Sequence, residues 1–320
     1  MIILIHACSR KLADLPVARH EWARMIGVCM RVIDSHVHLY PPDANVDPVR
    51  WGNERGELNW VAMSTRRRKN GVPVQTFPRL DALLREMDAS GVERSVLLGW
   101  YWQNPDTCAE QNRFFAECAR AQPDRISAFA TILPTARRER ALSEMHRSRD
   151  EGLVGLGELS PHAQGYAIDD AVFHEMLQLA ADWRWPVNMH VTDPNSRDYP
   201  GRVETPLKDF TSLARAHPDV TWVLAHWGGL LPLRDPDAAE LKNIYYDSAA
   251  SPLLYDETVW KRMQAAVSAE HLLFGSDFPL NLYPKSDAMP NMGSLIDETR
   301  RMKVPAAVMR ENVLRLLPPA

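Results

Sequence analysis

Eight short apolar runs, separated by longer amphipathic segments, constrain this chain more than any other feature. The runs are rich in β-branched residues and span residues 31–36, 94–99, 126–132, 153–159, 186–191, 221–226, 243–248 and 271–277. Apolar and polar residues do not alternate cleanly along them, which is typical of parallel strands that are buried on both faces. We therefore interpret the runs as the strands of one parallel sheet.

The segments between the runs predict helices that alternate with these strands. Apolar residues recur at spacings of three and four within residues 106–122, 137–150, 169–183, 206–216 and 256–269. A strand and its helix together take about 30 residues, as a βα unit does. No glycine-rich fingerprint follows the first run, as it would in an open dinucleotide-binding sheet. The sequence therefore predicts an α/β protein with a closed (β/α)8 TIM barrel and a C-terminal helix.

Two segments depart from this regular repeat. The step from the first run to the second is about twice as long as the others, which predicts an insertion at about Leu39–Thr76 on the face where barrel enzymes carry out chemistry. This insertion is a candidate lid. Residues 1–29 are interpreted as a peripheral N-terminal extension, because Met1–Ile5 is apolar but lacks the basic region and the length of a signal peptide. Residues 30–320 then form a single barrel domain.

Composition narrows the classes of partner. There are 37 Lys and Arg residues against 41 Asp and Glu, a net charge of −4, which argues against nucleic acid as a partner because phosphate binding needs a basic surplus. The sequence contains no run of about 18 apolar residues, so it predicts no membrane-spanning helix. The four cysteines form no CxxC pair, which indicates reduced thiols and a cytoplasmic location. We expect a small-molecule substrate, and the sequence leaves a homo-oligomer open.

Polar side chains stand at the ends of several predicted strands. In a barrel these ends converge on the mouth, and the polar residues found there are His36, His38, Glu158, His190, His226 and Asp277. His36 and His38 lie two positions apart on one strand face, so both rings can reach a single ion. Imidazole with carboxylate ligands favours zinc or a neighbouring divalent metal such as manganese or iron. Satisfied core histidines and a turn-capping aspartate are the alternative, but six such residues at strand ends favour a metal site.

Two further motifs lie near the predicted mouth. Trp100-Tyr101-Trp102 follows the second run and predicts an aromatic substrate wall, with Trp100 and Trp102 as the contacts. The alternative places these rings in the core. The basic run Arg66–Lys69 lies in the insertion, where it would steer an anionic substrate or form an ordinary solvated loop, which is the commoner fate of such runs.

Six short segments together resemble the amidohydrolase superfamily, specifically its amidohydrolase-2 branch. These are Asp34-Ser35-His36-Val37-His38, Gly157-Glu158-Leu159, Met189-His190, Ala225-His226-Trp227-Gly228-Gly229, Phe274-Gly275-Ser276-Asp277-Phe278-Pro279 and Asn312-x-x-Arg315-Leu316. The likeness extends over residues 31–317. This branch includes decarboxylases similar to those acting on aminocarboxymuconate semialdehyde and resorcylate, as well as lactone and ester hydrolases.

The resemblance implies a role for each of the polar residues. His36, His38, His190 and Asp277 would bind one divalent ion, with zinc expected first and manganese as the alternative. Glu158 is a further candidate ligand whose role the resemblance leaves open. Mononuclear relatives often lack a ligand on this strand, whereas in binuclear relatives a carboxylate there bridges two ions, with His190 and His226 shared between them, so a second ion is left open. No lysine occupies a matching strand end, so the form of the binuclear site that uses a carbamylated lysine is excluded.

The resemblance also implies two reaction classes. The first is a metal-dependent hydrolase that opens a small carboxylated lactone, ester or amide through a metal-activated water. In it, Asp277 would accept the proton of the water, and His226 would contact and polarise the substrate. The alternative is a nonoxidative, metal-dependent decarboxylase of a small aromatic or unsaturated carboxylic acid. A binding protein with a vestigial site is disfavoured, because every ligand position is filled.

Overall fold

A computed structural model of the chain describes residues 31–135 and 137–317, so the predicted extension over residues 1–29 lies outside the described residues. Each of the eight predicted strands is present. They are β1 (Val32–Val37), β2 (Val92–Leu97), β3 (Ile126–Ala128), β4 (Leu156–Leu159), β5 (Val187–Met189), β6 (Trp222–Leu224), β7 (Ile244–Asp247) and β8 (Leu272–Leu273).

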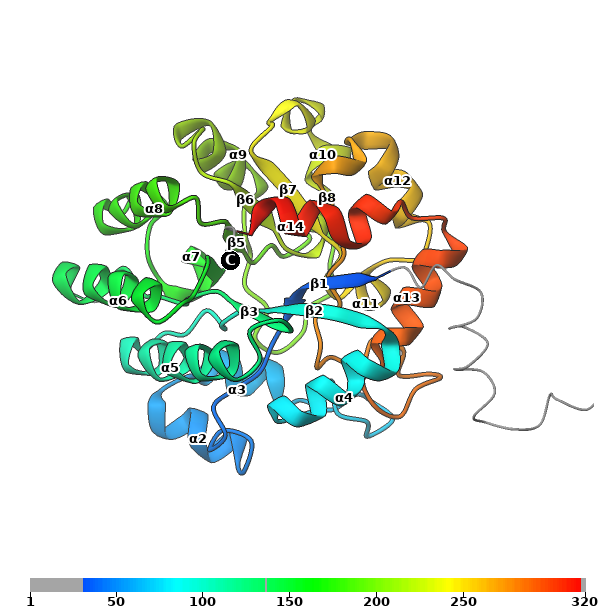
Figure 1. Ribbon diagram of the computed structural model, residues 1–320, viewed down its shortest axis with the longest axis horizontal. Coiled ribbons are helices and arrows are strands. Elements are labelled where there is room, and N and C mark those ends of the chain that lie inside the picture. Colours follow the sequence, from blue (N-terminus) through cyan, green and yellow to red (C-terminus); the bar gives the residue numbers. More distant parts are fainter. Residues whose placement is uncertain (1–30, 136, 318–320) are drawn as a thin grey trace, which may run out of the picture. The chain divides into compact units, whose positions relative to one another are not determined.

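The strands run parallel and close on themselves. Hydrogen bonds join them in the order β1-β2-β3 and β4-β5-β6-β7-β8. A parallel bridge between Ala130 and Leu156 connects β3 to β4, and another between Val37 and Phe278 connects β1 to the segment after β8. The predicted (β/α)8 TIM barrel is therefore confirmed, and Figure 1 shows its helices arranged around the strands.

The helices follow the strands in the expected alternation. They are α2 (Pro48–Arg55), α3 (Leu58–Ser64), α4 (Leu80–Ser90), α5 (Pro105–Ala121), α6 (Arg138–Asp150), α7 (Pro161–Gln164), α8 (Ala171–Trp183), α9 (Leu207–Ala216), α10 (Leu231–Arg234), α11 (Ser251–Leu254), α12 (Val259–Ala266), α13 (Met292–Arg301) and α14 (Asn312–Leu316), with the short 3-10 segments η1 (His226–Leu230), η2 (Pro236–Glu240) and η3 (Ala269–His271) and the π-helical η4 (Ala307–Glu311).

Local capping explains where the longer helices begin and end. Asn104 precedes α5 and accepts a hydrogen bond from the Asp106 amide, and a proline occupies the first turn, where no backbone donor is needed. The Asp170 side chain likewise accepts from two amides at the start of α8. Helix α4 ends at Gly91, whose φ of 77° is the left-handed conformation that glycine adopts without strain.

One end of the barrel is filled by apolar side chains. Ile33 of β1, Val96 of β2 and Phe129, which directly follows β3, pack with Val313 of α14 in one buried cluster. In Figure 1, α14 lies across the end of the barrel that faces the viewer. Because α14 packs against this end, the carboxyl ends of the strands form the open end.

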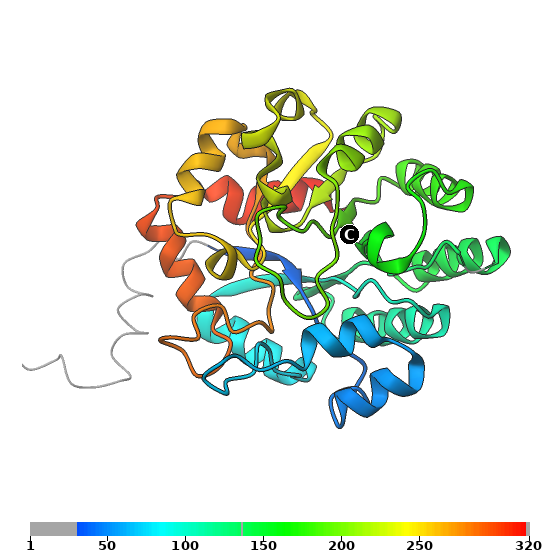
Figure 2. The same ribbon diagram turned by 180° about the vertical axis from the view of Figure 1, so that it is seen from behind.

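The predicted insertion carries α2 and α3, shown in blue in Figure 2. Aromatic rings fasten it to the barrel: Trp60 is fully buried, and its ring lies 5.1 Å from Tyr40, 5.4 Å from Trp51 and 5.4 Å from Trp102, between centroids. These edge-on and tilted arrangements are the favourable ones for aromatic pairs. The insertion is thus packed into the domain as part of the wall at the mouth.

Candidate metal centre

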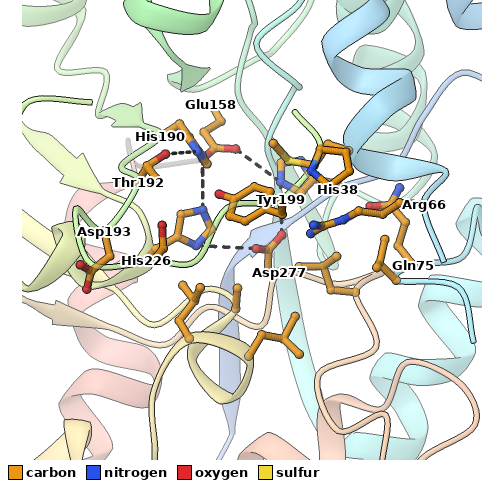
Figure 3. A pocket seen from close by; sticks show the side chains of 18 of the residues that line it. His38, Arg66, Gln75, Glu158, His190, Thr192, Asp193, Tyr199, His226 and Asp277 are labelled. Carbon is orange, nitrogen blue, oxygen red and sulfur yellow. Dashed lines mark hydrogen bonds and ion pairs between the residues drawn. The ribbon is translucent and has the colours of Figure 1, made fainter. Parts of the chain in front are cut away.

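The six polar residues predicted at strand ends come together in one buried group. His36 and His38 lie at the end of β1, Glu158 on β4, His190 just after β5, His226 just after β6 and Asp277 after β8. All are at most 8 % exposed. Figure 3 shows His38, Glu158, His190, His226 and Asp277 turned toward one another from different sides of the cavity. The barrel thus assembles side chains that lie up to some 240 positions apart in the sequence.

His36 and His38 direct their Nε2 atoms at each other across 3.1 Å. The other ring nitrogen of each is engaged: Nδ1 of His36 lies 2.9 Å from Oδ2 of Asp247, and Nδ1 of His38 lies 2.9 Å from the carbonyl oxygen of Leu98. When both Nδ1–H groups donate to these oxygens, two unprotonated Nε2 atoms face each other. A cation between them satisfies both lone pairs, which is the arrangement expected of metal ligands.

His190 and His226 form a second pair. Nδ1 of His190 lies 2.8 Å from Oε1 of Glu158 and 3.3 Å from Nε2 of His226. The remaining nitrogen of His226, Nδ1, donates to the carbonyl oxygen of Ala249 at 3.0 Å. This bond leaves Nε2 of His226 as the acceptor atom that faces the cavity.

Glu158 lies between the two histidine pairs and turns one oxygen to each. Its Oε2 is 3.6 Å from Nε2 of His38 and 3.9 Å from Nε2 of His36. Its Oε1 is 3.7 Å from Nε2 of His226, in addition to the contact with His190. Two groups of three potential ligands therefore share this carboxylate, His36 with His38 and Glu158, and Glu158 with His190 and His226.

Asp277 stands at the edge of both groups. Its Oδ1 lies 3.5 Å from Nε2 of His38, and its Oδ2 lies 3.7 Å from Nδ1 of His226. The backbone of Asp277 has a φ of 64°, a left-handed conformation that is uncommon for aspartate. Its amide donates to the carbonyl oxygen of His36 at 2.9 Å, which ties this residue to β1.

The protonation of the histidines follows from burial and from their neighbours. Burial and the nearby His36 lower the pKa of His38 to about 4, and burial and His190 lower the pKa of His226 to about 4. Both rings are therefore neutral near pH 7, as metal ligands must be. Burial alone would lower the pKa of His36, but the carboxylates of Asp247, Asp277 and Glu158 outweigh it and raise the pKa to about 10.

The two carboxylates of the cluster, Glu158 and Asp277, differ in pKa. Burial alone would raise the pKa of Glu158, but the imidazoles of His190, His36 and His226 hold it well below its usual range. Burial raises the pKa of Asp277 to about 7, because His36 lowers it less than burial and the neighbouring carboxylates raise it. One carboxylate is thus anionic throughout the neutral range, while the other gains or loses a proton near neutrality.

Asp247, at the end of β7, belongs to the site and was not predicted. It is fully buried; besides its contact with His36, it accepts hydrogen bonds from Asn188 Nδ2 at 3.1 Å and from the His226 amide at 3.1 Å. It therefore orients one ring and the backbone that carries another. A carboxylate within the apolar run 243–248 was the available signal, because such a group is rarely buried without a partner.

The donor set fits a divalent ion. Four imidazoles and two carboxylates converge within a buried space, and the ligand atoms of each three-residue group lie within 4.8 Å of one another. This mixture of nitrogen and oxygen ligands suits zinc and its divalent neighbours. The buried cluster therefore indicates a divalent-metal site.

A cavity of about 350 Å³ opens above the cluster. Its walls include Trp100 and Tyr101 from the loop after β2, and Arg66 and Gln75 from the insertion. Trp102, which we predicted as a substrate contact, is not among the described residues that line it. Its amide donates to the carbonyl oxygen of Trp100 at 2.8 Å, and this tight turn accompanies burial of the ring against Trp51 and Trp60. Tyr101, which we did not select, takes its place in the wall.

The sequence of the chain matches the profile of the amidohydrolase family, described as Amidohydrolase, over residues 33–318. The chain belongs to this amidohydrolase family. The resemblance inferred from the strand-end motifs is thereby confirmed. A comparison with curated proteins finds no match.

Solved structures share the amidohydrolase barrel at low sequence identity. The 5-carboxyvanillate decarboxylase LigW from Sphingomonas paucimobilis superposes with a TM-score of 0.68 at 16% identity, covering 90% of this chain and 98% of that one. A 2,6-dihydroxybenzoate decarboxylase from Rhizobium gives 0.58 at 18% identity, covering 89% and 98%. A probable 2-pyrone-4,6-dicarboxylic acid hydrolase from Acinetobacter baumannii gives 0.56 at 14% identity, also covering 89% and 98%. These likenesses establish the fold of this amidohydrolase.

None of the helices in the described part of the amidohydrolase chain has the length and apolar character that a bilayer-spanning helix requires.

Proposed function

We propose that this amidohydrolase is a metal-dependent hydrolase that opens a small carboxylated lactone, ester or amide. The observation that carries the proposal is the position of Glu158, which turns one oxygen to His36 and His38 and the other to His190 and His226. A carboxylate shared in this way is suited to bridging two ions, as in two-metal hydrolytic sites. We therefore infer two divalent ions per chain, with zinc as the first candidate and manganese as the second.

Each residue of the chain then has a defined task. When bound, divalent ions lower the pKa of water to about 7 and polarise a carbonyl group. His36, His38 and Asp277 would hold one ion, and His190 and His226 would hold the other. We predicted His226 beside the substrate as a polarising group, but the turn of its Nε2 toward Glu158 favours a ligand role.

Asp277 is the proposed proton carrier. Its two oxygens reach toward both histidine groups, so it lies where an attacking water would lose its proton. An acceptor in that position can take the proton and return it to the leaving group. The wall formed by Trp100 and Tyr101, whose ring centroids are 4.3 Å apart, would hold a flat substrate above this carboxylate.

A nonoxidative decarboxylase is the second candidate. The aromatic wall and the arginines that line the cavity also suit a small aromatic acid. Of the three solved structures described above, two carry decarboxylase names and one carries a hydrolase name. The same ligands would serve either reaction. Hydrolysis and decarboxylation therefore have to be distinguished by which solvent atoms enter the product.

Isotope labelling tests the choice between the two reactions. The protein is first screened against a panel of lactones and aromatic carboxylates, and the active compound is then converted in oxygen-18 water and, separately, in deuterium oxide. Hydrolysis places oxygen-18 in the product acid, which is the expected result. Release of carbon dioxide with deuterium on carbon and no oxygen-18 in the product would overturn the hydrolase assignment and establish the decarboxylase.

A further inference from the structure

The basic run of the insertion divides in the folded chain. Arg67 and Lys69 are exposed, whereas Arg66 and Arg68 are half-buried. Arg67 donates from Nη1 to the carbonyl oxygen of Gly71 at 2.8 Å, within its own turn. Arg66, Arg67 and Arg68 all lie in the cavity wall, and in Figure 3 the guanidinium of Arg66 points toward the centre of the pocket, beside Tyr199.

The backbone around Arg66 is fixed to the metal-binding end of the barrel. The amide of Val74 donates to the carbonyl oxygen of Arg66 at 3.2 Å, which closes a short hairpin. Gln75, directly after this hairpin, forms an antiparallel bridge with Leu280. Leu280 lies three residues after Asp277, so the hairpin is attached to the loop that carries the proposed proton acceptor.

The guanidinium of Arg66 has no anionic partner in the described part of the chain. The charged and phenolic groups that influence its pKa are Tyr199, Arg68 and Tyr101, and burial has the largest effect, lowering that pKa. An arginine nevertheless stays charged at neutral pH. Its Nε is buried and donates to no group of the described residues. A half-buried cation with a free donor is unfavourable unless an anion comes to it.

The carboxylates that share the cavity are already engaged. Asp193 accepts from Arg234 Nη2 at 2.7 Å and from the Tyr255 hydroxyl at 2.7 Å. Glu158 and Asp277 belong to the histidine cluster. Among the described residues, no carboxylate of this wall is therefore left to pair with Arg66, and its charge calls for an anion from the substrate.

Tyr199 sets the orientation of the guanidinium. The Arg66 Cζ atom lies 4.7 Å from the centroid of the Tyr199 ring, a cation–π contact that restrains the planar group. A restrained guanidinium with free N–H donors matches the two oxygens of a carboxylate in a paired arrangement, which a lysine cannot reproduce.

We propose that Arg66, held on the ring of Tyr199, binds a carboxylate of the substrate and thereby selects anionic substrates for the metal centre. This inference rests on the proposed function for the reaction that follows binding, but the binding itself does not. It also resolves the two interpretations of the basic run: Arg66 acts by direct contact, whereas Lys69 is exposed, does not line the cavity and is solvated.

Calorimetric titration with isophthalate, a flat dicarboxylate, tests the proposal; isophthalamide, its uncharged equivalent, is the control ligand. The proteins are the wild type, Arg66→Gln, Arg66→Lys and the matched control Lys69→Gln, which removes the same charge from an exposed position nearby. We expect Arg66→Gln to weaken isophthalate binding by at least about tenfold, Arg66→Lys to fall between it and the wild type, and Lys69→Gln to stay within about twofold. Isophthalamide binding should change in none of them.

Two outcomes would overturn the proposal. One is wild-type protein that does not bind isophthalate, and the other is an equal loss in Arg66→Gln and Lys69→Gln, which would indicate a diffuse field. Metal content measured on the same samples keeps the two proposals apart. Metal-free wild type that still binds isophthalate through Arg66 would refute the proposed function alone. Metal-loaded wild type without isophthalate binding would refute the carboxylate site alone.

Discussion

Asp247 lies outside the cavity wall but controls the groups that form it. Its Oδ2 accepts from His36, and its Oδ1 accepts from the amides of His226 and Ala249. The carboxylate thereby keeps a proton on Nδ1 of His36, so Nε2 is the nitrogen that would lose its proton and bind a metal. The same residue holds the start of η1, from which the His226 ring extends.

Replacing Asp247 with Asn should weaken metal binding by about 10 to 100-fold, because the amide cannot accept the His36 proton as a carboxylate does. Competition with a chromogenic chelator would measure the loss. Asp237→Asn makes the same chemical change at an exposed site of η2 and should leave the affinity unchanged. Equal affinities for the two variants would show that Asp247 does not support the ligands.

The protonation of the metal-free cluster predicts how affinity depends on pH. His36, with a pKa near 10, and Asp277, with a pKa near 7, carry protons that a metal must displace. As the pH rises from 6 to 8, fewer protons compete, so binding should tighten by at least about tenfold per pH unit. Chelator competition at several pH values, corrected for the protonation of the chelator, measures the slope. An affinity that does not change over this range would contradict the proposed ligand set.

A site residue could be predicted where its place in the sequence shows directly that it lies at the end of a barrel strand. The HxH pair and the histidines after β5 and β6 were visible, because each interrupts an apolar run where a barrel strand ends. Asp247 was overlooked because the run that contains it was taken as a strand without chemistry. The placement of Trp102 depends on a turn between Trp100 and Trp102, and three adjacent aromatic residues do not reveal such a turn.

At the level of elements, the insertion determines the shape of the cavity. Trp60 on α3 is enclosed by rings from α2, from the segment after β1 and from the loop after β2. The neighbouring loop after β5 meets the same helix, because Asn59 Nδ2 donates to the carbonyl oxygen of Gly201 at 2.9 Å. Gly201 has a φ of +83°, and a Cβ there would lie 3.0 Å from Met63 Cβ, so only glycine fits this junction easily.

Trp60→Ala should lower the free energy of unfolding by about 3 to 5 kcal/mol, because it removes a fully buried ring and leaves a cavity. Urea denaturation followed by circular dichroism would measure the change. Leu58→Ala, in the same helix at a side chain that is 62 % exposed, should cost no more than about 0.5 kcal/mol. Similar losses in both variants would mean that the aromatic cluster does not anchor the insertion.

The hydrophobic pattern of the sequence predicts the presence of the strands and helices better than it predicts the residues at which they end. The runs at 126–132 and 271–277 are longer than β3 and β8, because the chain leaves the strand geometry before the run ends. After β8, the amide of Phe274 donates to the carbonyl oxygen of Val308 and Asp277 adopts a left-handed conformation. Contacts with a distant helix decide this departure, and a local pattern does not contain them.

At the level of the whole molecule, the barrel separates stability from chemistry. Val313 of α14 packs among the apolar side chains at one end, while the polar residues occupy the carboxyl ends of the strands. This division matches the general arrangement of barrel enzymes. It also explains why structures only 14–18% identical retain the same architecture over about nine-tenths of the chain. The fold needs apolar strands and an apolar helix that packs against one end of the barrel, whereas the reaction depends on a few residues at the mouth.

Elemental analysis of the purified protein, together with its activity before and after removal of metal, tests whether the histidine and carboxylate cluster is a catalytic metal centre. We expect about two divalent ions per chain, loss of activity on chelation, and recovery when zinc or manganese is returned. The Glu158→Gln variant should lose metal from both groups, because it removes the ligand they share. A protein that is free of metal and fully active would contradict the claim that this cluster is a catalytic metal centre.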